Sequence, residues 1–135
     1  MKNRKYTVRA FTLTEILVVL IIIGILVLLA LPNLFPLVAK AKTTEAKIQL
    51  EHLYTLERTY FFEHSRYTTD LTDLSYEQSM LVTNGGQANY RIEVADANEN
   101  AFRIRAVAVA DFDGDGIFNV WEINQDKELK EVTKD

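Results

Sequence analysis

The most telling absences in this 135-residue sequence are cysteine and any recognisable catalytic motif. Without cysteine, no disulfide can hold together a small exported domain, so something else must restrain its loops. The sequence also has no Ser/His/Asp order, no phosphate-binding loop and no redox pair. Nothing in it therefore indicates an enzyme.

Acidic residues are missing from the first ten positions, which instead carry Lys2, Arg4, Lys5 and Arg9. Without these four cations, 11 basic and 19 acidic residues remain, for a net charge of −8. An acidic remainder argues against nucleic-acid binding as the main role. The basic tip indicates a cytoplasmic N-terminus by the positive-inside rule.

Charge is also missing between Ile16 and Leu31, within an apolar stretch that runs from residue 11 to residue 31. As a helix, these residues would span roughly 30 Å, the thickness of a bilayer core. A secretory signal peptide would have a shorter apolar region, followed by a small-residue cleavage site. Residues 32–36 offer no such site, so we expect the apolar segment to be retained.

The next segment, residues 37–64, has the pattern of an amphipathic helix. Its apolar residues form one stripe, and we expect its charged residues on the more solvent-exposed side. The stripe consists of Ala46, Leu50, Leu53 and Tyr60 with Leu56 beside it, and the charged residues are Lys40, Lys42, Lys47, Glu51 and Glu57. Pro32 and Pro36 predict a kink or a locally melted turn before this helix.

Alternating apolar and polar residues between positions 88 and 132 predict a small antiparallel sheet of about three to four strands. Two strands centre on Ile92 and Ile104, joined by a turn at 96–100, and two more are expected at 119–124 and 128–132. The predicted fold class is α+β, in which a long N-terminal helix, half transmembrane and half amphipathic, packs on this sheet.

The segment from Ala10 to Val19, AFTLTEILVV, resembles the class III signal of type IV pilins and type II secretion pseudopilins. In that family a short basic leader precedes a small residue, then Phe, then an apolar helix with Glu at its fifth position. Phe11 and Glu15 fit this pattern, and Gly24 and Pro32 fall where the family has a helix glycine and proline. The family mostly has glycine where this chain has Ala10.

The resemblance implies three parts: a leader (1–10), a transmembrane and filament-core helix (11–36) and a pilin-like head domain (37–135). A prepilin peptidase would cut between Ala10 and Phe11, and the new amine of Phe11 would be N-methylated. Glu15 would pair with that amine, in the same subunit or a neighbouring one. A carboxylate in lipid costs at least ~2–3 kcal/mol, so it requires a partner.

An acidic loop near the C-terminus, residues 111–122, fits the twelve-residue spacing of a calcium loop. The expected oxygen ligands are Asp111, Asp113, Asp115, the carbonyl of Ile117, Asn119 and Glu122, with Gly116 at the sharp turn. The flanking segments look like strands, so this would be an EF-hand-like loop and not an EF-hand domain. An acidic turn without metal is the alternative. Bound calcium would restrain the loops of this domain in place of a disulfide, which a chain without cysteine cannot form.

The sequence thus favours a structural subunit of a type IV pilus or related filament, assembled with identical or related subunits through its apolar helix. It would be stored in the bacterial inner membrane and then become an extracellular or periplasmic filament. One alternative is a pseudopilin of a type II secretion or DNA-uptake machine. Another is a monomeric, membrane-anchored calcium-binding module for adhesion or sensing.

Overall fold

The computed structural model describes residues 10–135, and the chain divides into two compact units, Met1–Leu34 and Phe35–Asp135. The first unit contains helix α1 (Leu13–Ala30) and the short 3-10 helix η1 (Leu31–Asn33). The second contains helix α2 (Phe35–His64), the 3-10 helix η2 (Val82–Asn84) and strands β1 (Tyr90–Ala97), β2 (Phe102–Ala108), β3 (Val120–Asn124) and β4 (Leu129–Thr133). Most of the predicted leader, residues 1–9, lies outside the described part.

The predicted interruption near Pro32 is confirmed. The α-helical pattern stops at Ala30 and gives way to η1, in which the N–H of Leu34 donates to the carbonyl of Leu31 at 3.1 Å. Proline lacks an N–H and its ring crowds the preceding turn, so Pro32 ends the regular helix. Pro36 lies in the first turn of α2, where a missing N–H has no helical partner to lose.

The second unit is built on a four-stranded antiparallel sheet with the order β1-β2-β3-β4. Each strand pairs with the next along the chain, in a register that sets Ile92 opposite Ala106 and Ile104 opposite Ile123. Strands β3 and β4 each start and end within one residue of the limits predicted from the sequence. The α+β prediction is therefore confirmed, with four strands.

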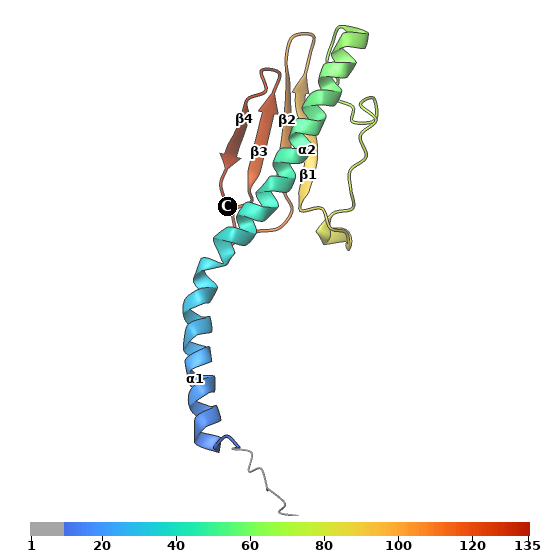
Figure 1. Ribbon diagram of the computed structural model, residues 1–135. Coiled ribbons are helices and arrows are strands. Elements are labelled where there is room, and N and C mark those ends of the chain that lie inside the picture. The colour runs from blue at the N-terminus through green and yellow to red at the C-terminus, as the bar shows by residue number, and fades with distance from the viewer. Residues whose placement is uncertain (1–9) are drawn as a thin grey trace, which may run out of the picture. The chain divides into compact units, whose positions relative to one another are not determined.

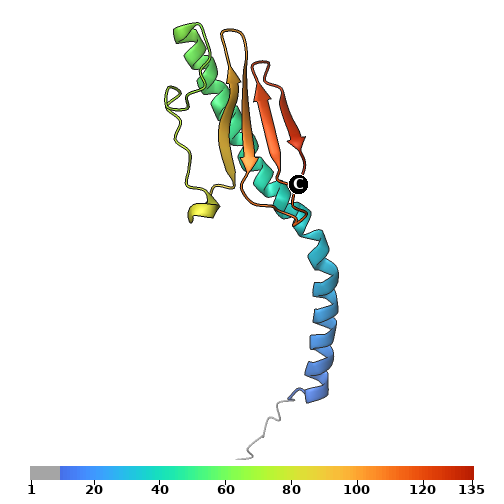
Figure 2. The ribbon, with the colours of Figure 1, turned by 180° about the vertical axis from the view of Figure 1, so that it is seen from behind.

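Helix α2 packs across one face of this sheet, as Figures 1 and 2 show from opposite sides. The apolar stripe predicted on the helix is the side that is buried, and the alternate residues of the strands meet it. The buried core comprises Ala46, Leu50 and Leu53 of α2 together with Tyr90, Ile92, Phe102, Ile104, Ala106 and Ile123 of the sheet. Helical and strand periodicity thus predicted the core of this unit.

The prediction that Glu57 faces the wetter side of the helix is wrong, because its side chain is fully buried. Glu57 lies between Leu53 and Tyr60 on the buried stripe, and Tyr67 and Leu74 from the segment after α2 join the core. The Oε2 atom of Glu57 accepts a hydrogen bond from the backbone N–H of Thr68 at 3.2 Å, while Oε1 has no partner among the described residues. Burial raises the pKa of Glu57 to about 7, despite the opposing effect of the Thr68 bond.

Candidate functional sites

Helix α1 exposes apolar side chains on all of its sides. Its large apolar residues are between 48% and 82% exposed, and none of its residues is buried. Over 18 residues, with a mean hydropathy of 3.1, it is long and apolar enough to cross a membrane. Such a surface is stable in water only if lipid or other protein covers it.

The N-terminus of α1 is closed by a capping box between Thr12 and Glu15. The hydroxyl of Thr12 accepts from the N–H of Glu15 at 3.2 Å, and the Oε2 of Glu15 accepts from the N–H of Thr12, also at 3.2 Å. This reciprocal pair satisfies two donors that have no partner within the helix. It also holds the carboxylate of Glu15 at the start of the helix.

Ala10 and Phe11, the residues on either side of the predicted cut, precede α1 in exposed, non-helical backbone. Gly24 lies inside α1, and a Cβ added there would meet no other described atom within 4 Å. The described chain therefore does not itself require glycine at this position. A glycine on an exposed apolar helix leaves room for a second helix to approach closely.

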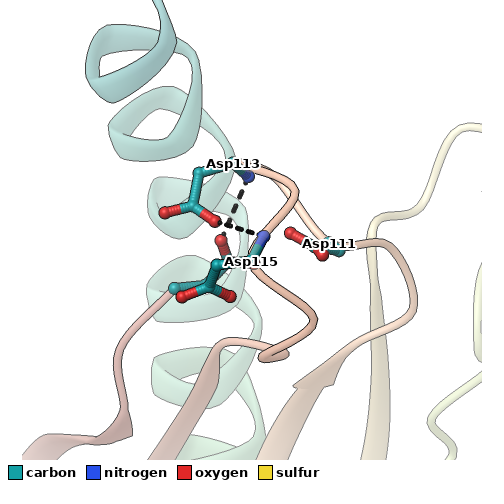
Figure 3. A group of neighbouring side chains, drawn as sticks. Asp111, Asp113 and Asp115 are labelled. Atoms are coloured by element: carbon teal, nitrogen blue, oxygen red, sulfur yellow. Dashed lines mark hydrogen bonds between the residues drawn. The ribbon is translucent and has the colours of Figure 1, made fainter.

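The acidic loop between β2 and β3 brings Asp111, Asp113 and Asp115 together, as Figure 3 shows. Carboxylate oxygens of these three and of Asp135 all lie within 4.8 Å of one another. Asp135, which follows β4, is a further member that lies outside the predicted twelve-residue spacing. Its two carboxylate oxygens accept from the N–H groups of Phe112 at 2.9 Å and Asp113 at 3.2 Å.

Backbone N–H groups shape the loop around its first aspartate. Asp111 accepts from the N–H of Gly114 at 2.6 Å and of Gly116 at 2.7 Å. Both glycines have positive φ angles, 85° and 87°, which other residues rarely adopt. The turn predicted at Gly116 is thus present, and Gly114 makes a second one.

The loop carboxylates differ in their proton affinity. The N–H donors of Gly116 and Gly114 lower the pKa of Asp111 below its ordinary value. Partial desolvation, and then the like charges of Asp115, Asp135 and Asp111, raise the pKa of Asp113. Carboxylates gathered this closely repel one another, and a hard cation with oxygen ligands would relieve that repulsion.

Two of the predicted ligands lie elsewhere. Glu122 is in β3, where its Oε2 accepts from the Nε of Arg105 at 2.9 Å. Asn119 is buried, and its Oδ1 accepts from the hydroxyl of Tyr90 at 2.7 Å while its Nδ2 donates to Glu131 at 2.7 Å. Asn119 therefore ties three strand regions together inside the domain. The N–H of Ile117 donates to Asp115 at 2.7 Å, so this residue stays within the loop.

Comparison with known proteins supports the resemblance seen at the N-terminus. Residues 6–31 match the family described as the prokaryotic N-terminal methylation motif. Over 87 residues, 64% of the chain, the sequence is 38% identical to the type IV major pilin protein PilA of Myxococcus xanthus (strain DK1622). The matched stretch covers 38% of that protein's length. The predicted resemblance to type IV pilins is therefore confirmed.

Proposed function

We propose, from the type IV pilin N-terminal segment that this chain carries, that the protein is a structural subunit of a type IV pilus or a related filament. The observation that carries the proposal is α1, a helix of 18 apolar-rich residues with none buried, within the matched methylation motif. Its surface requires lipid in a membrane-stored precursor and neighbouring helices in a filament. The relative named as a major pilin favours a pilus over a secretion pseudopilin.

In this proposal a prepilin peptidase cuts between Ala10 and Phe11 on the cytoplasmic side, and the new amine is N-methylated. The exposed, non-helical backbone at these two residues would admit a peptidase. Glu15 then pairs with the Phe11 amine of its own or a neighbouring subunit. The capping box supports this step, because it already keeps the Glu15 carboxylate 3.2 Å from the N–H of Thr12, the residue next to Phe11.

Mass spectrometry of the protein purified from its native cells tests the processing step. We expect a chain that starts with N-methylated Phe11. A chain that still carries residues before Phe11 would instead favour a monomeric membrane-anchored module.

The assembly step is tested by Glu15→Gln in filaments that also contain wild-type subunits. Glutamine can still complete a capping box but carries no charge, so the helix end is kept while the ion pair is lost. We expect the variant to be strongly depleted from filaments, whereas Glu51→Gln, on the exposed side of α2, enters them normally. Normal incorporation of Glu15→Gln would refute the pairing.

We further propose that the acidic loop binds calcium, in a structural and not a catalytic role. Asp111, Asp113, Asp115 and Asp135 would supply the ligands, together with the carbonyl of Ile117. The ion would join the loop between β2 and β3 to the segment after β4, which a chain without cysteine cannot do by a disulfide. Carboxylate oxygens are the donors that calcium prefers.

Calcium-dependent unfolding tests the loop proposal. At a calcium concentration about 100 times the dissociation constant, stability should rise by about 2.7 kcal/mol. Asp113→Asn should remove most of that gain. Asp126→Asn, in the exposed turn between β3 and β4, should keep it. An equal response to calcium and magnesium, or none at all, would count against the site.

A further inference from the structure

A pocket lies between the early turns of α2 and the end of the sheet, and shares Asp135 with the acidic cluster. Its volume is about 350 Å³, and it is lined from α2 by Lys40 and Lys47 and from the sheet side by Trp121, Glu131 and Lys134. Figures 1 and 2 both show the C-terminal end of the chain beside these turns of α2. The pocket therefore gathers three lysines from distant parts of the sequence.

The carboxylates of this pocket have hydrogen-bond partners, whereas its lysines have no carboxylate partner among residues 10–135. Its carboxylates already have partners: Glu131 accepts from Asn119 at 2.7 Å, and Asp135, which also lines the pocket, accepts two backbone N–H groups of the acidic loop. Among residues 10–135, by contrast, neither Lys40 nor Lys47 nor Lys134 has a carboxylate within 4.0 Å. With three lysines and two carboxylates, the lining carries a net side-chain charge of +1, which favours an anionic ligand.

Trp121 supplies an aromatic side chain to the pocket lining. Its indole Nε1 is enclosed but has no hydrogen-bond partner in the described part of the chain. The ammonium of Lys47 lies 4.3 Å from the centroid of its ring, a cation–π contact.

We propose that this pocket binds the phosphate of an anionic phospholipid headgroup, and so holds the head domain at the membrane before assembly. The inference rests on the membrane-stored precursor of the proposed function. Pro36 at the pocket rim is six positions after Ala30, the end of α1, and six steps of the chain can span at most about 20 Å. Lysines beside a membrane attract anionic lipids, and tryptophan is enriched at the headgroup level.

The only tryptophan of the sequence, Trp121, reports directly on the pocket. We would reconstitute the full chain, one copy per nanodisc, in phosphatidylcholine with a rising fraction of phosphatidylglycerol. We expect a saturable change in Trp121 emission that disappears at high salt. In Lys134→Gln the apparent affinity should fall about fivefold, as the loss of one lysine near an anionic surface implies.

Lys130→Gln is the matched control, because Lys130 lies on β4 outside the pocket and pairs with Glu128 at 2.9 Å. Its titration should equal that of the wild type. Equal emission in discs with and without phosphatidylglycerol would overturn the proposal. The same change produced by inorganic phosphate in neutral discs would assign the pocket to free phosphate and also overturn it.

A response that follows the number of chains per disc, and not the lipid, would assign the pocket to a second copy of the chain instead. None of these outcomes depends on cleavage or filament assembly. An unprocessed N-terminus would refute the proposed function without changing the emission, so the two ideas fail separately.

Discussion

Helices α1 and α2 both carry apolar surface, but the chain itself covers only that of α2. Leu53 in α2 is fully buried under the sheet, whereas Leu20 in α1 is 63% exposed. Helix α2 carries apolar residues along one side, with Glu57 among them, and the chain supplies a sheet to cover that side. Helix α1 is apolar all round, and no described residue of the chain buries any part of it.

This contrast locates the source of each helix's stability. The second unit gains from apolar area that its own fold removes from water. The first unit can gain comparable energy only where lipid or other protein covers α1, because an all-round apolar surface is unfavourable in water. Substitutions in α2 should therefore change folding of the single chain, and substitutions in α1 should change insertion and assembly.

The largest difference is expected from Leu53→Ala compared with Leu20→Ala. Truncating a buried leucine leaves a cavity and should lower the free energy of unfolding of the head by about 2–5 kcal/mol. Leu20→Ala should change it by less than about 0.5 kcal/mol. Denaturant unfolding of the full chain in detergent, followed by Trp121 fluorescence, measures both. A similar loss for both variants would show that α1 contributes to the stability of the head.

The reverse contrast is expected from a new charge at two similarly exposed isoleucines, Ile22 in α1 (52%) and Ile48 in α2 (64%). Ile22→Arg places a cation in the middle of the apolar helix, where insertion scales give a cost of about 2.5–3.5 kcal/mol. Ile48→Arg should have no effect on insertion. Carbonate extraction of membranes from expressing cells measures the inserted fraction. Equal insertion of the two variants would argue against a membrane-spanning α1.

Sequence reasoning succeeded where the controlling interactions are local. The break at Pro32 and the turn at Gly116 both depend on neighbours within a few positions. The stripe of α2 and the alternation of the strands predicted the core for a similar reason, because helical and strand periods are fixed by the backbone.

The prediction for Glu57 was wrong because its charge alone favoured the solvent side. Glu57 follows Leu53 by four residues and precedes Tyr60 by three, so the helical period itself places it on the buried stripe. For Asn119 and Asp135, by contrast, a distant segment decides the environment of the side chain. Asn119 was assigned to the metal loop by spacing, yet it bonds Tyr90, 29 positions away in the sequence. Asp135 joins the acidic cluster through the closing strand β4, and no local pattern signals such a contact.

Glu57 extends the comparison of the two helices, because it is a carboxylate of α2 that the chain itself buries. Its pKa is about 7 in the folded protein and 4.5 ordinarily, so the folded state binds the proton more tightly. Stability should therefore fall as pH rises from about 4.5 to 7 and stay level above that. The loss from this group should be roughly 2–3 kcal/mol.

Glu57→Gln removes the titration but keeps an oxygen for the Thr68 bond. The free energy of unfolding of this variant, minus that of the wild type, should be roughly 2–3 kcal/mol larger at pH 8 than at pH 5. Glu51→Gln, on the exposed side of α2, should show no such pH-dependent difference. Urea unfolding at the two pH values provides the measurement. Parallel pH profiles for wild type and Glu57→Gln would mean that solvent reaches the carboxylate.

The smallest effect is expected on the sheet face that α2 does not cover, where Arg105 and Glu122 form an ion pair at 2.9 Å. Arg105 is 37% exposed at its side chain, so water and salt screen the pair. Arg105→Gln should cost about 0.2–1 kcal/mol and lose its effect at high salt. Arg91→Gln, exposed on β1, should be silent. Because Glu122 lies outside the aspartate cluster, Arg105→Gln should also leave any stabilisation by calcium unchanged; a weaker calcium response would return Glu122 to the ligand set.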